Sequence, residues 1–258
     1  MHSLAIITSK NYVGGEADVN WFYAHSLALL CVEEGAFGAQ PSSAGQLGVG
    51  RRAFLDIEHV PLVGGRLCLD FVNTTGARRS GTPRERLTSY EALLVWAKRS
   101  GLLARSRVAQ LRQEGRRKPE RARRVLTAAL ALRERLYRTF LDVISDKPPE
   151  KEHLEILSAA FKQAHRWKHL VWHTGRLQWH STRDATALGG FLDGVVGSAL
   201  EVLTSDEMQR LKKCGECDWL FLDRSKNGSR RWCKKDCRDR VKARRYYRKY
   251  GQRASGRR

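Results

Sequence analysis

Four of the six cysteines in this 258-residue chain lie within its last 45 residues, in two closely spaced pairs. Two residues separate Cys214 from Cys217, three separate Cys233 from Cys237, and fifteen lie between the pairs. Zn²⁺ binds four thiolates at the corners of a tetrahedron, about 2.3 Å from each sulfur. Four thiolates leave no coordination position open for water, so the spacing predicts one structural zinc ion rather than a catalytic one.

The segment between the two pairs has the pattern of a β-hairpin. The apolar residues 219–222 and the returning residues 230–232 flank Asn227 and Gly228, a dipeptide that suits a tight turn. The predicted order is a metal-binding knuckle, a hairpin and a helix, which is a treble-clef-like plan. A module of about 40 residues rarely folds unaided, so we expect the metal to supply most of its folding free energy.

A strongly basic helix is expected directly after the last cysteine. The formal net charge is +21, and residues 205–258 hold 19 Lys and Arg against 7 Asp and Glu. Such an excess indicates a polyanionic partner. On a helix over 238–250, closed by Gly251, we expect Asp239, Ala243 and three tyrosines to form one narrow packed face, with basic residues on the remainder.

The favoured partner of this helix is double-stranded DNA. The predicted contacts are nine basic residues: Arg230, Arg231, Arg238, Arg240, Lys242, Arg244, Arg245, Arg248 and Lys249. RNA is the alternative if Tyr246, Tyr247 and Tyr250 are exposed, since aromatic rings stack on unpaired bases. A zinc-stabilised module that binds an acidic protein is a second alternative, because the same positive charge would serve it.

The residues before the zinc module have a mainly helical pattern. Apolar spacing predicts helices over about 88–100, 106–114, 119–145, 150–164 and 184–211, and a short β-hairpin over 170–180. Thr88 and Glu91 have the spacing of a capping box, and Gly101 supplies a stop. The expected fold class is mainly α (α+β): a helical N-terminal domain with a short β-hairpin, followed by a separate zinc module.

The helical domain is expected to sense a small-molecule effector rather than to bind nucleic acid. Asp70 and Asn73 lie in an apolar segment and are candidate ligand-binding residues, with internal caps or turns as the alternative role. The side chains of Trp167, Trp172 and Trp179 are candidate aromatic walls of a ligand cavity.

Other classes of function and location are disfavoured by the sequence. His165, His169 and His173 are spaced for one helix face, but a strand that begins within this stretch would split them, so a metal site there is not favoured. Phosphate-cradling loops, nucleophile elbows and clear acid–base pairs are absent, so we expect no enzyme. No apolar run reaches the roughly 18 residues of a membrane span, and no signal peptide is evident, so we expect a cytoplasmic protein.

Cysteines in the cytoplasm stay reduced, which supports metal ligation over disulfides for the two pairs. The other two, Cys31 and Cys68, are interpreted as small buried hydrophobic residues. Residues 1–53 are rich in Gly, Ser and Ala and are predicted to be a poorly ordered extension, unless the true start codon lies downstream. No coiled-coil seam is present, and the oligomeric state stays open.

The region from Cys214 to Tyr247, with its Trp-Leu-Phe-Leu-Asp-Arg-Ser-Lys-Asn run and Arg230-Arg231-Trp232-Cys233, resembles the CGNR zinc-finger family. The stretch from Leu62 to Thr74 is similar to the start of the ABATE domain that usually precedes this finger. Together the two likenesses cover residues 54 to 248. They imply an ABATE-like domain over 54–205, a zinc finger over 206–250 and a basic tail over 251–258. Members of this bacterial family are regarded as stress-related transcription regulators, so the resemblance implies such a role.

One departure from the family pattern lies at the last zinc ligand. The Cys-Gly-Asn-Arg signature here reads Cys237-Arg238-Asp239-Arg240. The cysteine and the final arginine are kept, whereas any contact made by the family's Gly and Asn is lost. Arg238 is gained, and a further arginine favours phosphate binding at the expense of base discrimination.

Overall fold

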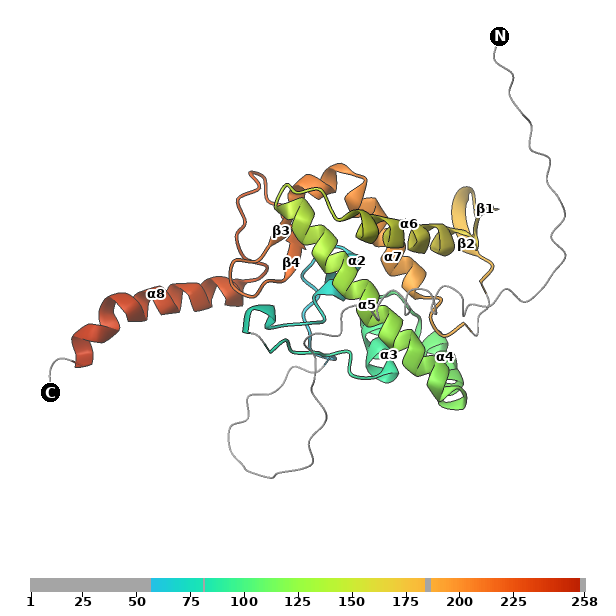
Figure 1. Ribbon diagram of the computed structural model, residues 1–258, viewed down its shortest axis with the longest axis horizontal. Coiled ribbons are helices and arrows are strands. Elements are labelled where there is room, and N and C mark those ends of the chain that lie inside the picture. The colour runs from blue at the N-terminus through green and yellow to red at the C-terminus, as the bar shows by residue number, and fades with distance from the viewer. Residues whose placement is uncertain (1–56, 81, 184–186, 256–258) are drawn as a thin grey trace, which may run out of the picture. The chain divides into compact units, whose positions relative to one another are not determined.

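The computed structural model describes residues 57–80, 82–183 and 187–255, which belong to one compact unit, Leu47–Arg258 (Figure 1). The predicted extension over residues 1–53, Cys31 and the last three residues of the predicted tail lie outside the described residues. None of the described helices is long and apolar enough to cross a membrane.

Helices dominate the described part of the chain. They are α2 (Leu67–Val72), η2 (Arg78–Ser80), α3 (Tyr90–Arg99), α4 (Arg105–Arg117), α5 (Pro119–Ile144), α6 (Lys151–His165), α7 (Leu192–Leu203), η3 (Asp206–Arg210) and α8 (Lys235–Ser255), where η marks a short 3₁₀ helix. The strands are β1 (Lys168–His173), β2 (Arg176–Ser181), β3 (Leu211–Lys213) and β4 (Leu220–Leu222), paired as two antiparallel two-stranded sheets. This confirms the mainly α fold class and the hairpin predicted over 170–180.

Helix α3 shows how local signals set an element's ends. The predicted capping box at Thr88 is wrong, because the helix starts one residue later: the Ser89 Oγ accepts the Ala92 N–H at 3.1 Å. The Glu91 carboxylate instead accepts hydrogen bonds from Arg112 of α4, from Nε to Oε2 at 2.8 Å and from Nη2 to Oε1 at 2.5 Å. Gly101 ends the helix as predicted, with a φ of 77° that favours glycine.

Helix α5 contacts α2, α3, α4, α6 and β3 and so organises the fold (Figure 1). Pro119 starts it, since a proline at the first position loses no helical hydrogen bond. The buried Arg133 side chain on this helix donates from Nη1 to Glu85 Oε1 at 2.8 Å and to Thr74 Oγ1 at 3.2 Å. These bonds fix the loop before α3 onto the middle of α5.

The long helix predicted over 184–211 is wrong at both ends. Within it, α7 covers only Leu192–Leu203, residues 188–191 form turns, and η3 and β3 follow. Thr204 ends α7, and its Oγ1 donates back to the Leu200 carbonyl at 2.8 Å. Pairing of Leu211 with Leu222 in the second sheet overrides the helical periodicity of the sequence. Helix α7 packs closely at Gly194, where a Cβ would lie 2.5 Å from Leu102.

The zinc module shares its hydrophobic core with the helices, which corrects the expectation of a separate module. All three residues of β4 are buried, and they join one cluster with Phe71, Trp96 and Phe140. Strand β4 contacts α2, and β3 contacts α5. An apolar Leu-Phe-Leu strand would be exposed to water in a free-standing module, so its burial explains why the two parts pack together.

Candidate metal centre and basic helix

The four predicted ligands converge on one point. The Sγ atoms of Cys214, Cys217, Cys233 and Cys237 all lie within 4.8 Å of one another. Cys233 Sγ lies 3.4 Å from Cys217 Sγ and 3.7 Å from Cys237 Sγ. Ligands about 2.3 Å from a tetrahedral ion are separated by about 3.8 Å, so the four thiols are close enough together to bind one Zn²⁺.

The first cysteine pair occupies the turn between β3 and β4. The Cys214 N–H donates to the Trp219 carbonyl at 2.8 Å, and Asp218, with a φ of 62°, reverses the chain. The predicted hairpin between 219–222 and 230–232 is therefore wrong: β4 pairs with β3, and residues 230–232 form no strand. The knuckle and the hairpin turn are the same segment.

A buried carboxylate explains why the chain after β4 forms a loop instead of a returning strand. Asp223 accepts hydrogen bonds from the Arg230 N–H at 2.8 Å, Lys212 Nζ at 2.8 Å and the Ser225 hydroxyl at 2.6 Å. Burial opposes ionisation of Asp223, but these donors outweigh it and hold its pKa well below the ordinary value. Gly228 makes the predicted turn, with a φ of 56°, inside this loop.

The second cysteine pair attaches α8 to the metal centre. Cys233 precedes the helix and donates its N–H to Cys214 Sγ at 3.4 Å, while Cys237 lies in the first turn. The Arg240 Nη2 lies 3.2 Å from Cys237 Sγ. Four thiolates around Zn²⁺ carry two net negative charges, so a guanidinium donor beside them stabilises the ligand set.

Glu216, within the knuckle, provides a second attachment for α8. Its largely buried carboxylate accepts hydrogen bonds from Arg244 Nη1 at 2.9 Å and from Arg240 Nε at 3.3 Å. Arg230 is also engaged internally, since its guanidinium donates to the carbonyls of Trp232 and Cys233. Three of the nine predicted nucleic-acid contacts therefore hold the module together.

The remaining basic residues of α8 form an exposed stripe. Arg238, Lys242, Arg245 and Lys249 follow one another at helical spacing of four, three and four residues, and all are exposed. Within the part of the chain that the structure describes, Lys242, Arg245 and Arg248 make no ion pair. Arg238 lies 3.4 Å from its neighbour Asp239, and Arg231 lies over the Trp232 ring.

The expectation that the tyrosines of α8 pack is wrong. Tyr246, Tyr247 and Tyr250 are 61%, 70% and 42% exposed, and their rings contact one another rather than the core. Asp239 and Ala243 on the same face are also exposed. Gly251 does not end the helix, which continues to Ser255. Past its attachment to the knuckle, α8 extends away from β3 and β4 (Figure 1), so no described neighbour covers this face.

Two family models account for most of the described residues. Residues 65–206 match ABATE, described as "Putative stress-induced transcription regulator", and residues 210–250 match the CGNR zinc finger. The chain belongs to the ABATE family. A search of curated proteins finds no match. The CGNR match and the four converging thiols together assign one structural Zn²⁺ to this ABATE protein and a regulatory, zinc-binding role.

The candidate ligand residues of the ABATE region lie where it meets the finger. Asn73 is buried, and its carboxamide donates to the Leu220 carbonyl at 2.8 Å and accepts the Leu220 N–H at 2.9 Å. The Asp70 carboxylate accepts the Gly64 N–H at 2.8 Å, and burial raises its pKa to about 6. These contacts are hydrogen bonds within the protein, which is the alternative role predicted for Asp70 and Asn73. Because the bonds of Asn73 link segments 147 residues apart, sequence patterns give no signal for them.

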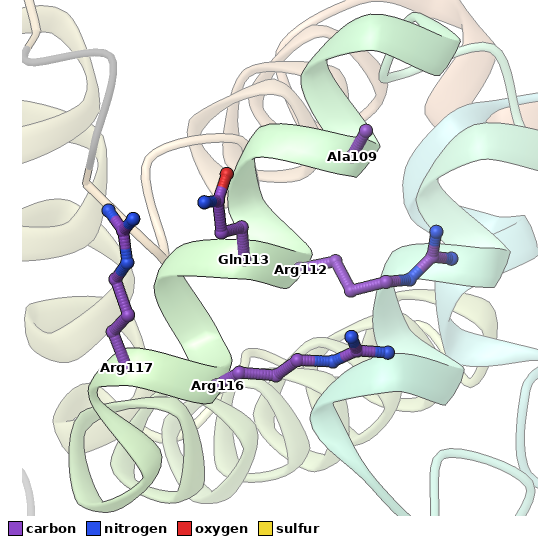
Figure 2. Close-up of a pocket in the computed structure, with 5 residues that line it drawn as sticks. All are labelled: Ala109, Arg112, Gln113, Arg116 and Arg117. Carbon is purple, nitrogen blue, oxygen red and sulfur yellow. The ribbon is translucent and has the colours of Figure 1, made fainter.

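The predicted aromatic walls do not enclose a cavity in the ABATE domain. Trp172 and Trp179 are 70% and 63% exposed on the β1–β2 hairpin. An open groove of about 510 Å³ lies instead on α4, and the residues that line it all project from that helix (Figure 2). They are Ala109, Arg112, Gln113, Arg116 and Arg117. The arginine spacing on α4 is visible in the sequence, but the same spacing is typical of a solvated helix face, so it did not predict this groove.

The histidine set is split as the sequence suggests. His165 ends α6, whereas His169 and His173 lie on β1. Among the described residues, the four finger cysteines form a group close enough to hold a metal ion, and the histidines do not. Cys68 is buried and lies outside the metal centre, as predicted.

Proposed function

We propose that this ABATE protein is a cytoplasmic transcription regulator that binds double-stranded DNA through α8. The observation that carries the proposal is the exposed stripe of Arg238, Lys242, Arg245 and Lys249 on a helix whose first turns are attached to the metal centre. The proposal assigns no catalytic step to the chain. A small-molecule effector of the helical domain stays a prediction.

The dimensions of the stripe suit a duplex. From Arg238 to Lys249 a helix rises about 16 Å, and the major groove of about 12 Å width admits one α-helix. Cys237 and the Arg244–Glu216 pair fix the N-terminal turns of α8. The helix therefore presents its cations in a fixed direction, so less side-chain and backbone freedom must be lost on binding.

RNA is the second candidate, and the exposed tyrosines favour it. Tyr246 and Tyr250 lie beside the basic stripe on α8, with ring centroids 4.9 Å apart. Exposed aromatic rings next to cations are the features that stack unpaired bases and neutralise a single-stranded backbone. A duplex does not present unpaired bases, so the tyrosines contribute to affinity for RNA and little to affinity for DNA.

Salt-dependent binding of the full chain tests the proposal. We expect Lys242→Ala/Arg245→Ala to weaken binding to all duplex sequences and to flatten the slope of log K against log salt by between about one and two units. The matched control is Arg105→Ala/Arg124→Ala, which removes from α4 and α5 two exposed cations that form no ion pair within the described residues. Fluorescence anisotropy with a labelled duplex, a structured RNA with an unpaired loop, and an acidic protein gives the three readouts.

Each outcome separates the candidate partners. Equal slopes for the α8 variant and the wild type would contradict the role of α8. Loss of RNA affinity, but not of duplex affinity, in Tyr246→Ala/Tyr250→Ala would favour RNA. Binding to the acidic protein alone would replace both nucleic-acid candidates with a protein-interaction role.

A further inference from the structure

The β1–β2 hairpin carries an apolar face that nothing in the described chain covers. Leu170, Trp172, Leu177 and Trp179 are 53%, 70%, 62% and 63% exposed. The strand register pairs Leu170 with Trp179 and Trp172 with Leu177, and residues two apart on a strand share a face. All four side chains therefore lie on one side of the sheet. In the described chain, β1 and β2 contact each other far more than any other element.

This face has a two-fold pattern of its own. The two tryptophans occupy one diagonal of the four positions and the two leucines occupy the other. Consider a second copy stacked face to face, related by a two-fold axis in the plane between the sheets. An axis along the strands places Leu170 over the second copy's Trp179, and an axis across the strands places Leu170 over its Trp172. Either axis brings every tryptophan against a leucine.

We propose that two copies of this chain associate through the apolar faces of their β1–β2 hairpins. A homodimer needs one patch that complements itself, and the diagonal pattern of two tryptophans and two leucines meets this requirement. The four exposed side chains present roughly 500 Å² per copy, so stacking buries roughly 1,000 Å² in total, about the minimum for a specific interface. An isolated two-stranded hairpin is marginally stable in water, and a second sheet against its apolar face stabilises it.

The opposite face of the hairpin is unsuited to this contact. It presents His169, His180, His173 and Arg176, which are polar and exposed, around the half-buried Val171 and Gln178. Stacking two such faces would bring polar and cationic side chains together, among them the exposed Arg176 of each copy. The dimer proposal concerns the tryptophan face alone, and it does not depend on the nucleic-acid role proposed for α8.

The first test is the mass of the full chain against concentration, measured by analytical ultracentrifugation without nucleic acid. We expect a dimer, and we expect Trp172→Ser/Trp179→Ser to raise the dissociation constant by at least about 30-fold, as truncation of buried interface tryptophans does. Tyr247→Ser is the matched control, since Tyr247 is as exposed as Trp172, at 70%. Unchanged zinc content and circular dichroism show that each variant folds. A wild type that stays monomeric at about 100 μM, or a tryptophan variant that dimerises like the wild type, overturns the proposal.

A second pair of variants tests the geometry while keeping the composition constant. Leu170→Trp/Trp172→Leu puts tryptophan over tryptophan if the axis runs along the strands, but keeps the complementary contacts if it runs across them. Trp172→Leu/Leu177→Trp does the reverse. We expect one of these exchanges, and only one, to weaken the dimer. If neither exchange weakens the dimer, the association is unspecific apolar contact, and the proposal is overturned. It is also overturned if Trp172→Ser/Trp179→Ser impairs RNA binding but leaves the mass unchanged, because the face would then bind bases.

Discussion

At the scale of single residues, three carboxylates have different roles because their surroundings differ. Asp223 is surrounded by donors that favour its charged form, and it shapes the loop before the second cysteine pair. Glu216 holds two arginines of α8. Asp70 accepts a backbone hydrogen bond from Gly64, but its burial outweighs that bond, so its pKa moves in the opposite direction to that of Asp223.

Asp70 should make stability depend on pH. Burial raises its pKa from 3.8 to about 6. Between these values the folded protein keeps a proton that the unfolded chain releases, so this group lowers stability as pH rises through that window. Asparagine at this position does not titrate, so Asp70→Asn does not lose stability in this window. The free energy of unfolding of Asp70→Asn minus that of the wild type should therefore increase by roughly 1–3 kcal/mol from about pH 4 to about pH 8. Urea unfolding at a series of pH values measures it.

The control for this experiment is Asp146→Asn. Asp146 is exposed and has a φ of 52°, a conformation that asparagine tolerates well. Measured over the same pH range, this variant gives the baseline for an Asp→Asn change at an exposed position. If the stability difference between Asp70→Asn and the wild type does not change with pH, the Asp70 carboxyl titrates as it does in water and the prediction is wrong.

At the scale of elements, local signals predict the helices, whereas tertiary contacts decide the strands of the finger. Pro119 and Gly101 set helix ends through their own backbone preferences, whatever packs against them. Helices α3, α5 and α6 begin and end within two residues of the prediction. Strand β3 has three residues, and it exists because Leu211 pairs with Leu222 across the knuckle. No local pattern distinguishes that pairing from a continued helix.

The tyrosine face of α8 shows a second limit of the same kind. Helical periodicity correctly places Asp239, Ala243 and the tyrosines on one side. It contains no information on whether another element lies opposite, and among the described residues none does. For the metal centre the sequence is sufficient, because four thiolates and one ion leave a single arrangement that satisfies all four ligands.

The attachment of α8 to the knuckle predicts an effect of Glu216→Gln. Loss of this carboxylate frees Arg240 and Arg244 and adds one net positive charge. If α8 binds DNA as proposed, affinity at low salt should increase, and the slope of log K against log salt should steepen by about one unit. The first turns of α8 should become more sensitive to protease because the helix loses one of its two attachments.

Glu155→Gln is the matched control for that variant. Glu155 lies on α6, is largely exposed and faces only Lys151 among the described residues, at 3.8 Å. Its removal changes the net charge by the same amount, far along the chain from α8. Weaker DNA binding by Glu216→Gln would mean that the carboxylate orients the helix for binding, and the predicted direction would be wrong.

At the scale of the whole molecule, zinc stabilises more than the finger. The hydrophobic cluster runs without interruption from Phe71 and Trp96 to Phe221 and the buried cysteines. The Trp219 indole Nε1 donates to the Thr75 carbonyl at 3.0 Å, which adds a polar link between the two parts. Unfolding of the finger therefore exposes apolar surface of the helical domain as well.

Zinc removal should consequently lower the stability of all the described helices in one transition. Zinc finger peptides gain about 10–16 kcal/mol from their metal, and a loss of even about 5 kcal/mol would lower Tm by about 10–20 °C in a chain of this size. Cys233→Ser should act like a strong chelator, while Cys68→Ala, which removes a buried thiol outside the centre, should keep its zinc. Calorimetry with and without chelator tests this; a surviving transition of the helices at the original temperature would contradict it.

The two hydrogen bonds between Asn73 and Leu220 also limit how freely the finger could be exchanged for another one. The ABATE and CGNR matches end and begin at residues 206 and 210, so sequence comparison treats them as two units that recombination can exchange. Yet the buried amide at the end of α2 finds both partners on the backbone of β4. A foreign finger that failed to present that backbone would leave the amide unsatisfied, at a cost of about 1–3 kcal/mol. In this chain the finger and the ABATE region are therefore matched at this contact, and exchange of one segment alone should destabilise the fold.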